Sequence, residues 1–135
     1  MELNYSAIVV ASLVYFVLGA FWYSPVLFAK PWMKMLGFSG GPMTEDQKKG
    51  MMRGMFFGFI SYIVMVGILD YYLYMLGVSN AASGAFHGLL MGLGFIATTG
   101  LASVLWEKRP LALYLINVTY PILGLAIAGA ILGAW

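Results

Sequence analysis

Four long apolar stretches constrain the fold of this 135-residue chain more than any other feature. Crossing the ~30 Å hydrocarbon core of a bilayer takes roughly 20 helical residues, and each stretch reaches that length. Because their apolar residues do not alternate with polar ones, helices are favoured over the strands of a β-barrel. The pattern predicts an all-α integral membrane protein, a four-transmembrane-helix bundle in one domain spanning residues 1–135. The predicted helices cover residues 3–23, 54–76, 82–106 and 111–134.

Composition excludes several classes of function. Hydrophobic residues make up 62% of the chain and charged residues 9%, whereas an ordinary soluble domain is about 25% charged. The chain has no cysteine and one histidine, so we expect no metal site of the usual zinc type and no cofactor. The basic residues flank the apolar stretches and form no stripe, so a nucleic-acid partner is not expected.

The positions of the basic residues predict an orientation. All of them lie in the connections between the first and second and between the third and fourth stretches, whereas the connection at 77–83 has none. By the positive-inside rule, the basic loops are cytoplasmic and both termini lie outside, in the bacterial cytoplasmic membrane. These residues are Lys30, Lys34, Lys48, Lys49, Arg53, Lys108 and Arg109.

The stretch FWYSPVLFAKPW, residues 21–32, marks a membrane boundary. Aromatic rings with one polar edge are favoured at the headgroup level. Residues 26–38 place apolar side chains opposite Lys30 and Lys34, which predicts a short amphipathic interfacial helix, with a kink at Pro31. This segment is expected to serve as a membrane-surface anchor or, alternatively, as a lipid or partner site. The predicted anchor residues are Trp22, Tyr23, Phe28 and Trp32.

A polar linker at residues 39–50 precedes the second apolar stretch. Thr44 followed three residues later by Gln47 is typical of a capping box, so we expect the helix to start near there, before it enters lipid. Glu45 and Lys49, four residues apart, are expected to pair on the exposed first turn.

Glycines recur every four residues on three of the predicted helices. Without a hydrophobic force between helices in lipid, association relies on close backbone approach, which small residues permit. These faces are predicted to pack helices within one bundle or, alternatively, to join subunits of a homo-oligomer. The predicted packing residues are Gly54 and Gly58, which follow Gly50 on the second helix, Gly84, Gly88 and Gly92 on the third, and Gly129 and Gly133 on the fourth.

Two ionisable residues flank the turn between the second and third helices. Asp70 lies about 10 Å of helix before the turn and His87 about 6 Å after it, so both reach a similar depth. Such groups are costly in a membrane and are functional candidates. We predict that they interact and can move protons, bind a cation or orient a substrate. Alternatively, Asp70 reaches headgroup water and His87 is a structural residue of the bundle.

A second polar group surrounds Pro121 in the stretch LINVTYP. Proline cannot donate to the carbonyl of Asn117, four residues earlier, so a hydrogen-bonded kink is expected. Asn117 and Tyr120 are therefore candidate intramembrane polar residues. The side chains expected to fill the gap are those of Asn117, Thr119 and Tyr120, together with Thr98 and Thr99 of the third helix.

Several of these residues carry a family resemblance. GAFWYSP at 19–25, with Phe28 and Trp32 following, LWE at 105–107 and the run from Leu115 to Tyr120 resemble the bacterial membrane family catalogued as domain of unknown function 1761. The similarity extends over nearly the whole chain, and WYSP is its most distinctive part. The resemblance implies a small four-helix integral membrane protein and carries no established activity. Pro121 is not part of the family pattern.

Three functions remain open at this point. The glycine faces and intramembrane polar residues favour a homo-oligomeric channel or carrier for a small solute or ion. The alternative is a non-catalytic membrane module that binds lipid or a membrane-protein partner. A small lipid-modifying enzyme is disfavoured because no nucleophile elbow is present, so we expect no enzyme and no catalytic residues.

Overall fold

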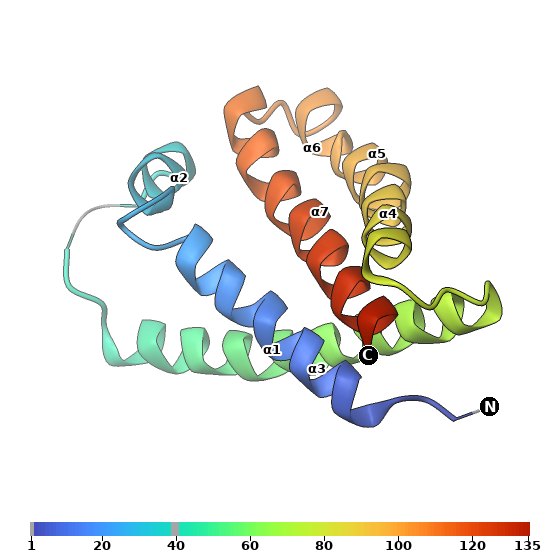
Figure 1. Cartoon of the computed structure of the whole chain (residues 1–135). Coiled ribbons are helices and arrows are strands. Elements are labelled where there is room, and N and C mark those ends of the chain that lie inside the picture. Colours follow the sequence, from blue (N-terminus) through green and yellow to red (C-terminus); the bar gives the residue numbers. More distant parts are fainter. Residues whose placement is uncertain (1, 39–40) are drawn as a thin grey trace.

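The computed structural model describes residues 2–38 and 41–135, and no strand occurs among them. Residue 1 of the predicted domain and residues 39 and 40 of the predicted linker lie outside the described residues. Figure 1 shows the arrangement of the helices. They are α1 (Tyr5–Trp22), α2 (Ala29–Leu36), α3 (Glu45–Met75), α4 (Ala81–Met91), the π-helix η1 (Gly92–Ala97), α5 (Thr98–Gly100), α6 (Ala102–Leu105) and α7 (Leu111–Ala134).

Four helical segments of the described chain are long and apolar enough to cross a membrane. The third is continuous through α4, η1, α5 and α6. The predicted all-α fold with four membrane-spanning helices is therefore confirmed. The four segments are Tyr5–Trp22, Glu45–Met75, Ala81–Leu105 and Leu111–Ala134.

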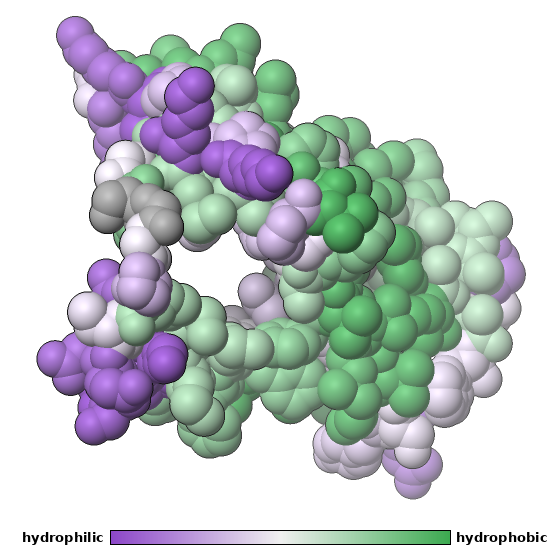
Figure 2. All heavy atoms as spheres, turned by 90° about the vertical axis from the view of Figure 1, so that its left-hand side faces the viewer, coloured by the Kyte–Doolittle hydropathy of each residue, from purple (hydrophilic) through white to green (hydrophobic). Residues whose placement is uncertain are grey.

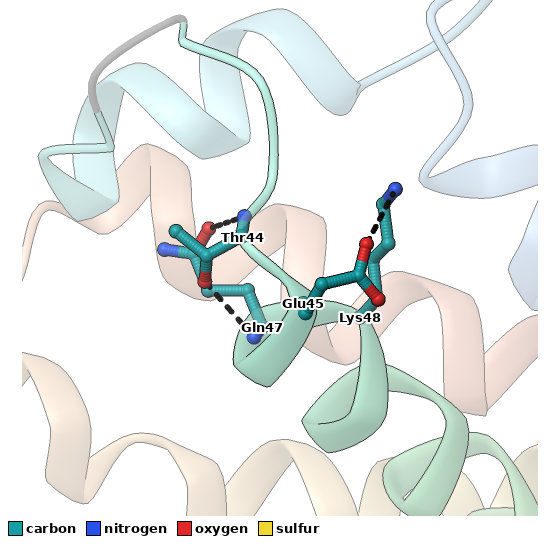
Figure 3. Close-up of polar contacts among 4 residues, drawn as sticks. All are labelled: Thr44, Glu45, Gln47 and Lys48. Atoms are coloured by element: carbon teal, nitrogen blue, oxygen red, sulfur yellow. Dashed lines mark hydrogen bonds and ion pairs between the residues drawn. The ribbon is translucent and has the colours of Figure 1, made fainter.

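The start of α3 is set by the predicted capping box, drawn in Figure 3. The Gln47 amide donates to Thr44 Oγ1 over 3.2 Å, and the Thr44 amide donates to Gln47 Oε1 over 2.9 Å. Two backbone donors that the helix leaves free are satisfied in this way. The ion pair of Glu45 is formed with Lys48, at 3.6 Å, and not with the predicted Lys49.

The short helix α2 covers Ala29–Leu36 and is shorter than the predicted segment 26–38. The chain turns through residues 23–28 before α2 begins at Ala29. Helix α2 ends at Leu36 and is followed by Gly37, whose φ of 78° suits glycine. Pro31 lies in the first turn of α2, where its missing N–H removes no intrahelical bond. The predicted kink at Pro31 is therefore wrong.

Helix α7 lies at the centre of the fold and contacts α1, α3, α4 and η1 (Figure 1). One of its faces meets α1 and another meets α4: Gly124 lies against Tyr15 of α1, and Gly129 lies against Gly84 of α4. The buried residues of α7 include four of the smallest side chains of the chain. They are Leu113, Val118, Tyr120, Gly124, Leu125, Ala128, Gly129, Leu132 and Gly133.

Helix α3 crosses the other helices at a steep angle, and its first half extends past α1 (Figure 1). Its buried residues, Val66, Leu69 and Leu73, all lie in its second half. Figure 2 shows the two hydrophilic patches on this side of the molecule, over α2 and over the start of α3, as separate areas. Most large apolar side chains of the first half of α3 are left uncovered: Met51, Met52, Met55, Phe56 and Phe57.

The third membrane-spanning segment contains a π-helical stretch in its middle. Thr98 Oγ1 donates to the Gly94 carbonyl over 2.7 Å, and Thr99 Oγ1 donates to the Phe95 carbonyl. Wider π-helical turns disturb the regular backbone ladder, and these hydroxyls satisfy carbonyls of that turn. Thr98 and Thr99 therefore serve their own helix and do not fill the gap at Pro121.

Candidate functional site at the aromatic end of α7

A tight turn after α1 folds the chain back toward α7. Ser24 Oγ donates to the Phe21 carbonyl over 2.7 Å, and the Ser24 carbonyl accepts from the amides of Leu27 and Ala29. The Trp22 carbonyl accepts from the Phe28 amide over 3.1 Å. The Phe21 and Trp22 carbonyls are among those that α1 leaves free at its end. The turn places the next aromatic residues against the start of α7.

Asn117 of α7 joins this turn and α2 to the bundle. Its Oδ1 accepts from the Tyr23 hydroxyl over 3.0 Å and from Trp32 Nε1 over 3.1 Å. The indole of Trp22 donates to the neighbouring Ile116 carbonyl over 3.0 Å. Because an indole N–H can only donate, the amide oxygen of Asn117 must face Trp32, and its NH₂ group must face elsewhere.

The rings around Asn117 contact one another. The ring centroids of Tyr23 and Trp32 lie 5.2 Å apart, and those of Tyr23 and Tyr120 lie 5.9 Å apart. Trp22 packs on Phe28 at 4.7 Å. Tilted and edge-on pairs at these distances are favourable. We name this group the aromatic cluster: Trp22, Tyr23, Phe28, Trp32, Asn117 and Tyr120.

The aromatic cluster unites two sets of residues that the sequence presented separately, the interfacial anchors and the polar residues near Pro121. Burial, with the nearby Tyr62 phenol adding to it, raises the pKa of Tyr23, which follows the last residue of α1, to about 12. A phenol with so high a pKa remains protonated at neutral pH. The Tyr23 hydroxyl therefore stays a donor to Asn117.

Tyr120 of the aromatic cluster also contacts Tyr15 of α1, a pairing that the sequence analysis did not predict. Tyr120 donates its hydroxyl to the Tyr15 carbonyl over 2.9 Å, and the two rings lie 5.0 Å apart. A Cβ at Gly19 would meet the Tyr120 ring, and a Cβ at Gly124 would meet the Tyr15 ring. Each helix thus places a tyrosine over a glycine of its antiparallel neighbour. The available signal was the shared spacing: a glycine follows each tyrosine by four residues.

The gap at Pro121 is not filled as predicted. Thr119 Oγ1 donates to the Leu115 carbonyl over 2.6 Å, and Tyr120 reaches across to α1. The indole of Trp22 supplies a donor to the Ile116 carbonyl, one residue before the carbonyl that Pro121 leaves free. A neighbouring segment thus supports this part of α7, which is how membrane helices tolerate proline.

Asp70 and His87 are not joined by any hydrogen bond or ion pair among the described residues. Asp70 Oδ2 accepts from the Asn4 amide over 3.2 Å, at the start of α1. The His87 ring instead packs edge-on against Tyr72, at 5.8 Å, and its Nδ1 is buried without a partner in this part of the chain. Residues 70 and 72 lie about 200° apart around a helix. Similar depth therefore did not bring Asp70 and His87 to one face, and their predicted interaction is absent.

The predicted glycine faces divide into two groups. A Cβ at Gly84 would overlap the Gly129 carbonyl, and one at Gly88 would overlap the Leu125 carbonyl, so α4 and α7 touch through their backbones. Gly92 meets Ile122 and Gly133 meets Asn80 in the same contact. A Cβ at Gly54, Gly58 or Gly50 would meet nothing within 4 Å. The expected packing of these α3 glycines within the chain is therefore absent.

A partly polar cavity of about 340 Å³ opens beside Asn117, between the third membrane-spanning segment and α7. Three further cavities in the described chain, of about 230, 380 and 390 Å³, are lined almost wholly by apolar side chains. The searched residues contain no cluster of acidic or histidine side chains that could hold a metal ion. Ile96, Thr99, Gly100, Ser103, Tyr114, Asn117 and Val118 line the partly polar cavity.

These features define the class of the protein: a small all-α protein with four membrane-length helices, whose short helix α2 is tied to the central helix α7 by an asparagine and aromatic donors. Residues 6–133 match the model of a family described as Protein of unknown function (DUF1761). The chain therefore belongs to this family, in agreement with the resemblance carried by the WYSP stretch. Comparison with curated proteins and with solved structures found no significant match.

Proposed function

We propose that this protein is a non-catalytic membrane module that binds phospholipid around the aromatic cluster. The observation that carries the proposal is the double hydrogen bond from Tyr23 and Trp32 to Asn117. It holds α2 against the bundle while Lys30 and Lys34 stay exposed. Aromatic rings and exposed lysines together suit the region where lipid headgroups lie.

The same proposal includes an orientation. The aromatic cluster and the basic residues of α2 lie at the end of α1 where α7 begins, and the positive-inside rule assigns that end to the cytoplasm. Both termini then lie outside, and the family resemblance supports a bacterial cytoplasmic membrane. Reporter fusions at residues 48 and 135 test this orientation, because they must report opposite sides.

A homo-oligomeric channel or carrier receives less support from the geometry of one chain. Asp70 and Asn117 are bonded to different neighbours, and most of the cavities described above are apolar. One observation still favours assembly: a Cβ at Gly54 or Gly58 of α3 would meet nothing within 4 Å in the described chain. A pore would therefore require several copies.

Lipid retention tests the proposed function. The protein is extracted in a mild detergent, and native mass spectrometry counts the phospholipids that remain bound; we expect at least one. The variant Asn117→Leu removes the acceptor for both donors and is expected to lose this lipid. A wild-type protein that retains no phospholipid and cannot rebind it would contradict the proposal. Solute flux above background in proteoliposomes would favour the channel or carrier instead.

A further inference from the structure

We propose that the partly polar cavity beside Asn117 binds the headgroup and glycerol region of an anionic phospholipid from the leaflet at the basic end. We call it the Asn117 cavity; it is lined by Ile96, Thr99, Gly100, Ser103, Tyr114, Asn117 and Val118. This inference rests on the proposed function and adds the lipid class and the site.

The Asn117 cavity offers hydrogen-bond donors that the fold does not use. The Oδ1 of Asn117 already accepts from Tyr23 and Trp32, and the indole of Trp32 fixes this orientation of the amide. The two N–H donors of the amide have no partner among the described residues. They are available to phosphate or ester oxygens of a lipid. The Ser103 hydroxyl, for which the described chain likewise shows no bond, lines the same cavity.

Positive charge lies next to the cavity in the connection between α6 and α7. The Arg109 amide donates to the carbonyl of Ser103 over 2.9 Å, which holds the Lys108–Arg109 pair beside this lining residue. The Arg109 side chain pairs with Glu107 at 3.5 Å, with both side chains exposed. Such exposed pairs are weak, so Arg109 can turn to an anionic ligand.

Size and depth agree with the polar part of a lipid. About 340 Å³ is at the lower end of the ~300–1,000 Å³ of ligand pockets, so the acyl chains would remain outside, along the apolar surface of the helices. Asn117 lies about 9 Å along α7 from its first residue, Leu111. The headgroup region of a bilayer is about 5–8 Å thick on each side, so the cavity reaches from that region to the glycerol level.

The first experiment compares two matched threonine variants. Thr99 and Thr119 are both exposed, and the hydroxyl of each donates to the carbonyl four residues earlier, but only Thr99 lines the cavity. In nanodiscs or detergent, binding of phosphatidylglycerol is measured by native mass spectrometry. We expect Thr99→Leu to weaken it about tenfold or more, because leucine fills polar space, and Thr119→Leu to leave it unchanged. Equal binding by the two variants would overturn the proposal.

The second experiment tests the charge and does not depend on packing in the cavity. The double variant Lys108→Gln/Arg109→Gln is compared with Lys48→Gln/Lys49→Gln at the start of α3. Each removed cation near the headgroup is expected to weaken phosphatidylglycerol binding about fivefold, with no such loss in the α3 variant. Phosphatidylcholine binding should change little in either case. Equal losses for both double variants would overturn the proposal even if Thr99→Leu fails to fold.

The outcomes separate the two claims. Bound phospholipid without preference for phosphatidylglycerol over phosphatidylcholine would overturn the assigned lipid class and leave the proposed function standing. A wild-type protein that binds neither lipid would contradict both.

Discussion

Two sets of glycines with the same spacing of four residues have different surroundings. One set lies on α4 and the start of η1 and consists of Gly84, Gly88 and Gly92; the other lies on α3 and includes Gly54 and Gly58. The first three meet the backbone of α7, which presents Gly129 and Gly133 in return. A Cβ at either α3 glycine would meet nothing within 4 Å in the described chain. A small-residue face permits close approach, but contact also needs a facing helix with small residues of its own.

A substitution in the α4–α7 contact is therefore expected to destabilise the protein more than one elsewhere. A side chain at Gly84 would run into the Gly129 carbonyl, which cannot move aside as a flexible side chain can. Gly84→Leu should destabilise the protein by about 3 kcal/mol or more, and much of it should fail to fold. Thermal unfolding in detergent, followed by circular dichroism, measures the loss. A variant as stable as wild type would show that the two backbones are not in contact.

Removing the hydrogen bonds that join α2 and the preceding turn to Asn117 of α7 should have the next largest effect on stability. Asn117→Leu keeps the approximate size of the side chain but leaves the Trp32 and Tyr23 donors without their acceptor. We expect a loss of about 1–3 kcal/mol, and faster amide hydrogen exchange over residues 29–36 as α2 detaches. Thr119→Leu, on the exposed side of α7, is the control. Unchanged exchange in α2 would mean that the hydrogen bonds to Asn117 do not hold this helix.

Removing one hydroxyl from the packed region should have a smaller effect. Tyr120→Phe keeps the ring over Gly19 and deletes the bond to the Tyr15 carbonyl. The expected cost is about 1 kcal/mol, measured by the same unfolding assay. Tyr71→Phe is the matched control because Tyr71 is 44% exposed and lies outside this contact. Equal stabilities of the two variants would argue that the hydrogen bond from Tyr120 to the Tyr15 carbonyl does not stabilise the fold.

The smallest effect is expected on the open face of α3. Because a Cβ at Gly54 meets nothing within 4 Å, Gly54→Leu should change the free energy of unfolding by no more than about 0.5 kcal/mol. The unfolding assay is combined with analytical ultracentrifugation in detergent. A loss as large as that of Gly84→Leu, or a change in oligomeric state, would reveal that a second molecule covers this face.

Local rules predicted the helices well and predicted their contacts only in part. The capping box at Thr44 depends on residues three apart, so it could be recognised without the fold. The aromatic anchors and Asn117 were both identified, but their meeting requires the turn at Ser24, which reverses the chain before α2. The reciprocal pair of Tyr15 and Tyr120 left a repeated spacing that was present in the sequence and went unused.

The Asp70–His87 prediction shows why similar depth in the membrane is insufficient to predict a contact between two residues. Distances along two helices estimate how far each residue lies from the turn, but they do not include rotation about the helix axis. Asp70 faces the start of α1, while His87 packs on Tyr72, on the other side of α3. No local signal defines which face of α3 meets α4.

The sequence by itself determined that this chain forms four membrane-length helices and that α3 starts at its capping box, because apolar length and capping residues act over a few neighbouring residues. Only the tertiary structure decided which glycine face is covered, that Asn117 receives the indole of Trp32, and that α3 crosses the other helices with its first half uncovered. Those outcomes depend on helix rotation and crossing, which arise from packing between segments far apart in the chain.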